Sequence, residues 1–360
     1  MKNIVYIGKY LGIVGGIERY MQNSAALLRK NGFAVHYLYT GEAVRNADDF
    51  SAAFDSVQEF SVANEYLQTA DLIIIHNIIP PELLNDLPAD KTFFFAHDHN
   101  IYCRRHHYYT SLGRKNCHRK YQSLRCFCCS LGRNAAPPLA EYRKFPALVL
   151  SEFMADNLRK NGFKKVFKLP AFIQIKYRQH TFMPDGILRI LFLGQLIRGK
   201  GADLMIPSLA NLKVPFVCTI AGDGKDREML ENMVKKYNLS EKVKFTGFVS
   251  EPEKLWLDCD VFCFPIRWQE PFGLVGLEAM ANGIPVVAFD RGGVREWMSD
   301  TRSGIAVPED GKLETAFSLL AENPEKLISM GEYSKKIAEE KFSERSFLEK
   351  FSSLLQENSI

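Results

Sequence analysis

Short apolar runs alternate with stretches of helical periodicity along most of the chain. Each run is a few residues long and is rich in β-branched and aromatic side chains, which is typical of β-strands. In the first half the predicted strands are residues 3–8, 34–39, 72–76, 92–96 and 147–150, with a helix over 16–31. In the second half the predicted strands are residues 188–193, 216–221, 243–246, 261–264 and 286–289. Strands that alternate with helices predict two α/β domains, each a doubly wound parallel sheet with helices on both faces.

The alternation lapses at two places, which predict the domain organisation. Residues 98–146 form a polar, basic, cysteine-rich segment inside the first half. Residues 170–186 are typical of a connection between domains. We therefore expect an N-terminal domain over residues 1–175 with an insertion at 98–146, and a C-terminal domain over residues 186–340. The last stretch, residues 323–355, has a helical pattern and is polar enough to lie on a surface.

The length and composition are those of a soluble globular protein. A chain of 360 residues is long enough for two domains, each with a core of its own. No uninterrupted apolar run approaches membrane-spanning length, and the first predicted strand begins at Asn3, which leaves no room for a signal peptide. These features predict a cytosolic protein, and eight cysteines in a cytosolic chain argue against a disulfide framework.

Positive charge is concentrated in residues 103–144. This segment contains ten lysines or arginines and one acidic residue, a local balance of +9 in a chain whose net charge is +4. Tyrosine and phenylalanine side chains are interleaved with these cations, a combination that suits an anionic membrane surface or a nucleic acid strand. A solvated basic loop is the alternative interpretation.

Five of the eight cysteines lie in the same segment. Four of them offer ligands for a tetrahedral zinc site, namely Cys103, Cys117, Cys126 and Cys129. Their spacings are irregular and do not form a pair of C-x-x-C knuckles. Reduced, partly buried thiols are therefore the default interpretation, and structural zinc is the alternative.

Residues 265–290 are predicted to form a strand end, a loop, a helix and a further strand. Pro271 suits the opening turn of this helix, because its missing N–H would have had no intrahelical partner there. The unpaired amides and the positive end of the helix dipole make that turn a site for an anion such as a diphosphate. Glu270 and Glu278 flank the turn, and carboxylates are good acceptors for sugar hydroxyl groups. Two ordinary solvated glutamates are the alternative.

Glycine-rich turns follow several predicted strands. Gly15 and Gly16 lie at the start of the first helix and lack the G-x-G-x-x-G spacing of a dinucleotide site. The loop 194–201 contains Lys200, which is placed to neutralise phosphate charge. Other turns and strand ends contain Gly222, Gly224, Phe248, Val249 and His97. Each is a plain turn or a structural histidine by default, but ligands collect at the carboxyl ends of strands in doubly wound sheets.

The order of these motifs over most of the chain resembles that of retaining glycosyltransferases of family 4. That family has the GT-B fold, in which two Rossmann-like domains face a cleft. The resemblance implies that Glu270 contacts the donor sugar, that Glu278 contacts the ribose of the nucleotide and that His97 hydrogen-bonds the sugar. Gly15 and Gly16 match the GG-x-E opening that closes over the donor diphosphate. His97 and Glu270 are therefore the candidate catalytic residues.

The other candidate donor-binding residues come from the same resemblance. Family members carry an arginine and a lysine in the loop that corresponds to 194–201. Lys200 matches the lysine, but Gln195 stands at the arginine position, and Arg198 is the candidate substitute. The remaining matches are Gly222, Gly224, Phe248, Val249, Pro271, Phe272, Gly273 and Leu274. A terminal helix, expected at 341–360, crosses back toward the N-terminal domain in GT-B enzymes.

The resemblance implies an enzyme that moves a hexose from a UDP- or GDP-linked sugar to a lipid-linked or oligosaccharide acceptor during surface-polysaccharide assembly. The family has no obligatory metal, and the expected mechanism is front-face attack in which the leaving phosphate helps to deprotonate the acceptor hydroxyl. We expect a cytoplasmic protein, peripheral at the inner face of the plasma membrane, with no nucleic acid partner. Two alternatives stay open: a nucleotide-sugar-binding protein that has lost turnover, and a zinc-dependent nucleic-acid binder.

Overall fold

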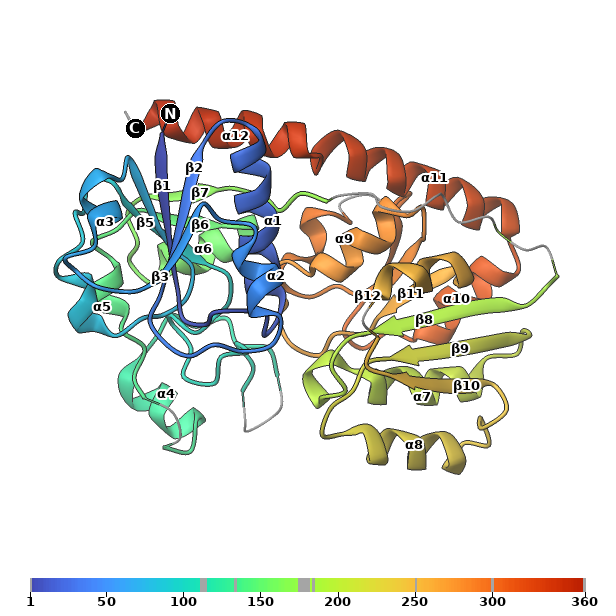
Figure 1. Cartoon of the computed structure of the whole chain (residues 1–360). Helices are drawn as coiled ribbons and strands as arrows, with labels where there is room; N and C mark the ends of the chain where they lie inside the picture. The colour runs from blue at the N-terminus through green and yellow to red at the C-terminus, as the bar shows by residue number, and fades with distance from the viewer. Residues whose placement is uncertain are drawn as a thin grey trace. The chain divides into compact units, whose positions relative to one another are not determined.

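The computed structural model describes residues 2–110, 115–132, 135–173, 182, 185–249, 251–298 and 301–358 (Figure 1). Contacts between Cα atoms divide the chain into two units. Unit 1 comprises Met1–Ala171 and Glu344–Ile360, and unit 2 comprises Phe172–Ser343. Most of the connection predicted at 170–186 lies outside the described residues.

Unit 1 is built on a parallel sheet with the strand order β3-β2-β1-β4-β5-β6-β7 (Figure 1). The strands are β1 (Asn3–Gly8), β2 (Ala34–Tyr39), β3 (Ser56–Glu59), β4 (Leu72–Ile75), β5 (Thr92–Ala96), β6 (Ala147–Val149) and β7 (Val166–Lys168). The helices are α1 (Gly16–Lys30), α2 (Ala47–Ser51), α3 (Glu65–Thr69), η1 (Pro81–Leu84), α4 (Ser123–Cys129), α5 (Leu139–Tyr142), α6 (Glu152–Lys160) and α12 (Glu344–Glu357). Strand β4 is a run of leucine and isoleucine that is buried throughout, as expected for a strand covered on both faces.

Unit 2 is built on a second parallel sheet with the strand order β10-β9-β8-β11-β12-β13. The strands are β8 (Leu188–Leu193), β9 (Phe216–Ala221), β10 (Val243–Gly247), β11 (Val261–Phe264), β12 (Val286–Phe289) and β13 (Gly304–Val307). The helices are η2 (Arg198–Lys200), α7 (Ala202–Asn211), α8 (Arg227–Lys236), η3 (Pro252–Asp258), α9 (Leu274–Ala281), η4 (Gly292–Glu296), α10 (Leu313–Ala321) and α11 (Pro324–Lys341). Apolar side chains of β8, β9, α7 and α10 meet in one core.

The two parallel sheets confirm the predicted α/β fold class. Three edge strands, β3, β7 and β13, were not predicted. Strands β3 and β7 are short and contain polar residues, and β13 is a four-residue run that begins at a glycine. The helix predicted over 323–355 is two helices, since Phe342 leaves the helical conformation with φ −127° between α11 and α12. In unit 1, α12 packs Phe351 edge-on against Phe33, with ring centroids 5.8 Å apart. None of the described helices is both long and apolar enough to span a bilayer.

Each sheet has a point at which the chain reverses the direction in which it adds strands. In unit 1 this point lies between β1 and β4, and in unit 2 it lies between β8 and β11. The loops that leave two such neighbouring strands diverge to opposite sides of the sheet, so the carboxyl ends there are left open to a ligand. A ligand site is therefore expected at the loops after β1, β4, β8 and β11.

Candidate functional site

In unit 2, the loops after β8 and β9 are held together by their backbones. The N–H of Leu196 donates to the carbonyl of Asp223 at 2.9 Å, and the N–H of Gly222 donates to the carbonyl of Gly247 at 2.8 Å. Gly222 has φ +127°, and a Cβ atom there would overlap the carbonyl of Gly194. Only glycine combines this conformation with this close approach. The predicted residues Gly222 and Gly224 therefore shape the site through the main chain.

The loop after β8 brings Lys200 to Glu270. It turns at Gly201, which has φ +78° and lies against the carbonyl of Pro265, and the N–H of Arg267 donates to the carbonyl of Gly199 at 2.8 Å. The Lys200 Nζ atom lies 3.0 Å from Glu270 Oε2, and both side chains are only partly exposed. Two residues that are 70 positions apart in the sequence thus form one charged pair at adjacent strand ends.

The backbone of Glu270 is fixed from its other side as well. The N–H of Gly293 donates to the carbonyl of Glu270 at 2.6 Å. Gly292, with φ +64°, lies so close to the main chain of Glu270 that a Cβ atom would overlap it. The turn after β12 therefore supports Glu270, which the sequence had identified only by its spacing from Glu278.

Helix α9 begins later than the sequence predicts. Gly273 is its N-cap residue with φ +89°, so Pro271 lies in the preceding loop, and the prediction that it occupies the opening turn was wrong. A left-handed glycine cannot continue a helix toward its N-terminus, which moves the start to Leu274. The loop is anchored by Trp297, whose Nε1 donates to the carbonyl of the buried Phe272 at 2.6 Å.

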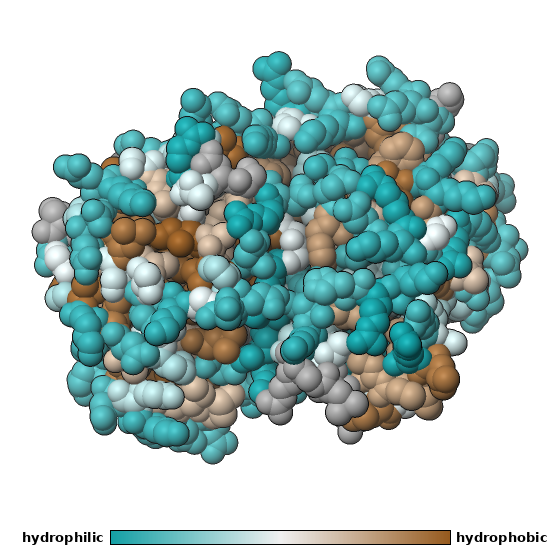
Figure 2. All heavy atoms as spheres, turned by 180° about the vertical axis from the view of Figure 1, so that it is seen from behind, coloured by the Kyte–Doolittle hydropathy of each residue, from teal (hydrophilic) through white to brown (hydrophobic). Residues whose placement is uncertain are grey.

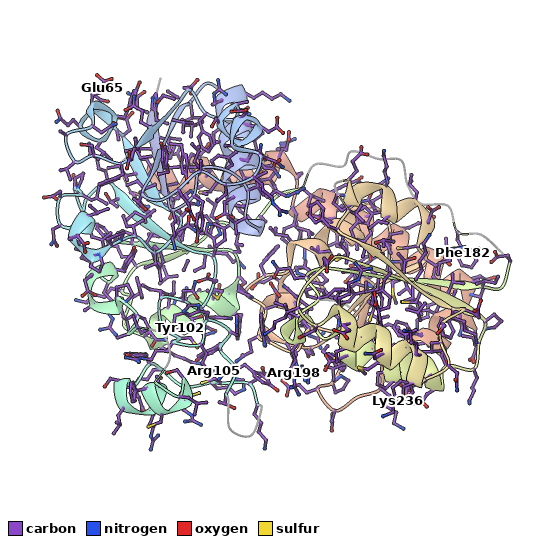
Figure 3. All side chains as sticks on the ribbon, turned by 60° about the horizontal axis from the view of Figure 1, so that its bottom comes forward. Glu65, Tyr102, Arg105, Phe182, Arg198 and Lys236 are labelled. Carbon is purple, nitrogen blue, oxygen red and sulfur yellow. The ribbon has the colours of Figure 1, made fainter. Side chains whose placement is uncertain are left out.

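The other predicted residues of unit 2 lie on the loops after β8 and β10 and on α9. Gln195 and Arg198 are exposed, and Figure 3 labels Arg198. Phe248 follows β10 and is 76% exposed, and the next residue, Val249, is half-buried. Glu278 lies in the second turn of α9 and is half-buried. Among these side chains, Gln195, Arg198 and Phe248 are open to solvent.

In unit 1, the turn before α1 is organised by a residue that the sequence analysis did not assign to the site. Glu18 is 4% exposed, and its Oε2 accepts a hydrogen bond from the N–H of Gly15 at 2.9 Å. A carboxylate in the first turn also offsets the positive end of the helix dipole. Gly15 and Gly16 are exposed, and nothing lies within 4 Å of a Cβ atom built on Gly15. The predicted glycines are therefore open to solvent.

His97 follows β5 and pairs with a second histidine that the sequence analysis missed. The Nδ1 atom of His76, which follows β4, lies 2.9 Å from Nε2 of His97. His76 is 2% exposed and His97 8% exposed. Burial lowers the pKa of His97 to about 3 and the pKa of His76 well below its ordinary value. Both imidazoles are neutral at physiological pH, and the available signal for His76 was its position after a run of isoleucines.

Two neighbours of His97 have separate roles. The carboxylate of Asp98 accepts hydrogen bonds from the main-chain N–H and side-chain amide of Asn100 at 2.8 and 2.7 Å. Burial, together with the nearby charge of Glu18, raises the pKa of Asp98 to about 6. His99 is 1% exposed and its Nδ1 lies 2.6 Å from the hydroxyl of Tyr102, inside the core. His97, rather than His99, is the histidine at the strand end.

The four cysteines proposed as zinc ligands line one pocket in the basic segment beside α4. Burial raises the pKa of the Cys103 and Cys117 thiols. Arg105, labelled with Tyr102 in Figure 3, lines the same pocket, and its Nη1 lies 3.5 Å from the carbonyl of Cys129. Within the described ranges, no group of three or more His, Cys, Asp or Glu side chains is placed to hold a metal ion.

Residues 174–337 match the family model described as glycosyl transferases group 1. This part of the chain is a group 1 glycosyltransferase domain. It includes almost all of unit 2 and every predicted donor-binding residue from Gln195 to Glu278. The residues of unit 1 lie outside that match.

Two curated relatives align with part of this chain. The O-antigen biosynthesis glycosyltransferase WclY of Escherichia coli is 38% identical over 112 residues, 31% of each chain. The N-acetylgalactosamine-N,N'-diacetylbacillosaminyl-diphospho-undecaprenol 4-alpha-N-acetylgalactosaminyltransferase of Campylobacter jejuni is 35% identical over 124 residues, 34% of each chain. The matched segments therefore span about a third of the length of these curated relatives.

The likeness to solved structures extends over both units. The structure of Anabaena Alr3699/HepE in complex with UDP matches with a TM-score of 0.76 and 18% identity, covering 99% of this chain and 100% of that one. This similarity shows the fold, and the chain has the two-domain GT-B fold. The group 1 domain is its second unit.

Proposed function

We propose that this protein transfers a hexose from a nucleotide-diphosphate sugar to a lipid-linked or oligosaccharide acceptor, with retention of the anomeric configuration. The observation that carries the proposal is the Lys200–Glu270 pair at the switch point of the group 1 domain. Relatives named for O-antigen and diphospho-undecaprenol substrates support a role in surface-polysaccharide assembly. Complexes of Alr3699/HepE with UDP and with UDP-glucose support a UDP-linked donor, with a GDP-linked donor as the alternative.

When the donor binds, its diphosphate and its sugar replace the contact between Lys200 and Glu270. Lys200 turns to the diphosphate, whose negative charge grows as the sugar departs, and Glu270 accepts hydrogen bonds from the sugar hydroxyls. The N-terminal amides of α9, from Leu274 onward, add the positive end of the helix dipole. Glu278 holds the ribose. Gln195 brings a hydrogen bond without a charge, so Lys200 is the principal cation, with Arg198 as its candidate companion.

His97 contributes a neutral hydrogen bond to the sugar. Its pKa of about 3 excludes an imidazolium at neutral pH, so it orients the donor and does not deliver a proton. Deprotonation of the acceptor hydroxyl falls to the leaving phosphate in the front-face mechanism. The turn at Gly15 and Gly16 closes over the diphosphate through main-chain N–H groups.

A donor panel tests the proposal. Thermal shift with UDP-, GDP- and ADP-sugars is expected to single out one nucleotide, because a ligand that binds only the folded state raises its melting temperature. Transfer to polyprenyl-diphosphate saccharides follows with that donor. Glu270→Gln should reduce kcat/KM by about 10²-fold or more, while Glu251→Gln, which breaks the exposed Glu251–Lys254 pair, should change nothing. If the unsubstituted protein binds a sugar nucleotide but does not turn it over, the result would favour the alternative, a nucleotide-sugar-binding protein that has lost turnover.

The acceptor proposal includes contact with an anionic membrane surface. Leu124 and Phe127 on α4, and Leu131 just beyond it, are 75%, 48% and 64% exposed and follow each other at helical spacing. Figure 2 shows hydrophobic side chains gathered over α4, at its lower right. The guanidinium of Arg104 lies 5.2 Å from the Phe127 ring centroid. Apolar side chains beside cations suit the headgroup region of anionic lipids.

Vesicle binding separates this membrane contact from its alternatives. Co-sedimentation with phosphatidylglycerol vesicles should be lost in a Leu124→Ser, Phe127→Ser variant and kept in Val217→Ser, which removes an apolar side chain of similar exposure from β9. Salt-dependent binding to oligonucleotides instead of vesicles would favour the nucleic-acid binder. Metal analysis of the purified protein decides the zinc prediction for Cys103, Cys117, Cys126 and Cys129.

A further inference from the structure

The donor contact assigned to His97 depends on a proton that lies between two buried rings. His76 Nδ1 and His97 Nε2 are 2.9 Å apart, and both imidazoles are neutral. One N–H must therefore lie on the line between these two nitrogens, because two bare nitrogens would repel each other and two N–H groups would clash. The pair has two arrangements, which differ in the ring that donates.

The rings around this pair prevent either imidazole from turning away. Phe95 stacks on His97 with ring centroids 4.2 Å apart, and Tyr6 lies 4.3 Å from His76. Tyr20 packs on the edge of His97 at 5.2 Å. Close-packed aromatic neighbours hold side chains in one rotamer. The choice between the two arrangements is therefore a choice of tautomer.

The two arrangements leave different atoms without a partner. His76 Nε2 and the hydroxyl of Tyr20 are both enclosed and have no hydrogen-bond partner among the described residues. If His97 donates, His76 Nε2 must carry a hydrogen, and an enclosed N–H is left orphaned. If His76 donates, its Nε2 carries only a lone pair, and an enclosed acceptor is left without a partner. Orphaned buried N–H groups are rarer than unsatisfied acceptors, which favours donation by His76.

We propose that His76 is a positioning residue that fixes His97 as the Nδ1–H tautomer, so that His97 acts toward the donor sugar as a hydrogen-bond donor. The Nδ1 atom of His97 is not among the enclosed unpartnered atoms of the described residues, so it is the ring atom left for a ligand. The sugar contact rests on the proposed function; the tautomer does not. His97 then recognises the lone pair of a sugar oxygen.

Nitrogen-15 NMR of the histidine rings tests the tautomer directly. The expected result is a neutral His97 with hydrogen on Nδ1 in the unliganded protein. His76→Phe keeps an aromatic ring against Tyr6 and Phe95 but removes the donor, so His97 should shift toward the Nε2–H form. His76→Asn, whose amide reaches the position of Nδ1, should keep the Nδ1–H form of His97. His36→Phe is the matched control, since His36 makes a 2.7 Å hydrogen bond to Ser56 on strands away from the pair.

Kinetics supply the second readout. His76→Phe should lower kcat by about 10-fold with the affinity for the free nucleoside diphosphate unchanged, while His76→Asn should stay within about 3-fold of the unsubstituted protein. A purely structural role for His76 would lower thermal stability and nucleotide affinity together. An Nε2–H form of His97 in the unsubstituted protein overturns the proposal, as does a His76→Phe variant with unchanged tautomer and kcat.

The two levels of the inference fail separately. If no sugar nucleotide is turned over by the unsubstituted protein, the proposed function fails, and the ring spectrum still decides the tautomer. If His76→Phe does not fold, the spectra of the unsubstituted protein and of His76→Asn decide it: an Nδ1–H form in both supports the proposal, and an Nε2–H form in either contradicts it.

Discussion

The two candidate sites hold polar groups at the same place in a parallel sheet, but they do so with opposite chemistry. In unit 2, Lys200 and Glu270 are charged, partly exposed and supported by loops that cross at glycines. In unit 1, His76 and His97 are neutral, almost fully buried and enclosed by aromatic rings. Burial disfavours a charge far more than a neutral hydrogen-bonding group. The charged pair therefore lies on glycine-containing loops, and the neutral histidine pair lies in the aromatic core.

This contrast indicates which changes each site tolerates. In the proposed function a diphosphate binds the cation of the charged site, so this site should be sensitive to charge and to the shape of its loops. The neutral site depends on where two protons lie, so it should be sensitive to pH and to ring substitution. The predictions that follow separate these two kinds of sensitivity.

The largest effect is expected from Lys200→Ala. Removing the principal cation leaves the growing charge of the leaving diphosphate without its main partner and leaves Glu270 unpaired, so kcat/KM should fall by about 10³-fold. Lys200→Arg should recover part of this loss because it restores the charge. Lys254→Ala is the matched control, since Lys254 forms an exposed pair with Glu251 at 2.6 Å. The measurement is steady-state kinetics with the donor found by thermal shift. An active Lys200→Ala variant would show that Lys200 does not bind the diphosphate.

The next effect contrasts one glycine from each site. Gly222→Ala places a Cβ atom into the carbonyl of Gly194 at a φ of +127°, and we expect it to lower the free energy of unfolding of unit 2 by about 3 kcal/mol or more. Gly15→Ala meets nothing within 4 Å and has an extended backbone with φ −166°, so it loses only the preference for glycine over alanine at the N-cap of α1, and its stability should change by about 1 kcal/mol or less. Urea unfolding measures both. Equal losses would mean that the loops of unit 2 are not closely packed.

The pH dependence of stability distinguishes the neutral site. His76 and His97 have lowered pKa values, so the unfolded chain binds more protons than the folded chain below pH 6.5. Their contribution is complete above the unfolded pKa and is lost as pH falls toward the folded pKa, with a slope of up to about 1.4 kcal/mol per pH unit for each ring. His76→Phe should remove the contribution of one imidazole to the pH dependence of the free energy of unfolding between pH 6.5 and 4.

Asp98 acts in the opposite direction and has to be separated from the histidines. Its pKa is raised to about 6, so its carboxyl favours the folded state at low pH, and that contribution is lost as pH rises from its ordinary value through 6. Asp98 is present in both proteins, so its contribution cancels when the free energies of unfolding of the unsubstituted protein and of His76→Phe are subtracted. Identical slopes for the two proteins from pH 6.5 to 4 would contradict the buried neutral assignment of His76.

The sequence predicted the two sheets because their central strands are continuous apolar runs. Strands β1, β2, β5, β8, β9, β11 and β12 have the predicted bounds. Edge strand β3 (Ser56–Glu59) has no apolar periodicity, since its side chains are half-buried or exposed. Pro271 was wrongly placed in the opening turn of α9, because the helix start is fixed by Gly273, whose φ of +89° depends on the loop that it closes. Local patterns predict buried elements well and predict poorly the turns that tertiary contacts decide.

The candidate site was only partly accessible to sequence reasoning for the same reason. Motif spacing identified Glu270 and Lys200 separately, but their 3.0 Å contact depends on the close approach of two loops at Gly199 and Gly201. Nothing in the sequence connects His76 to His97, because their pairing arises from the adjacency of β4 and β5 in the sheet. A strand order is a property of the whole chain, so the partner of a predicted histidine could not be found locally.

The smallest predicted effect concerns the anchor of the charged site. Trp297→Phe removes the hydrogen bond from Nε1 to the carbonyl of Phe272 and leaves that buried carbonyl unpaired, at an expected cost of about 1–2 kcal/mol in the free energy of unfolding. Because Phe272 lies two residues from Glu270, the loosened loop should also weaken donor binding by a few fold, measured by calorimetry. Trp256→Phe is the matched control: Trp256 is buried in η3 against Phe262, with ring centroids 5.4 Å apart, so it should lose stability without losing donor affinity. Equal donor affinities in the two variants would mean that Glu270 is held by Gly292 and Gly293 alone, and the anchor would then belong to the fold rather than to the site.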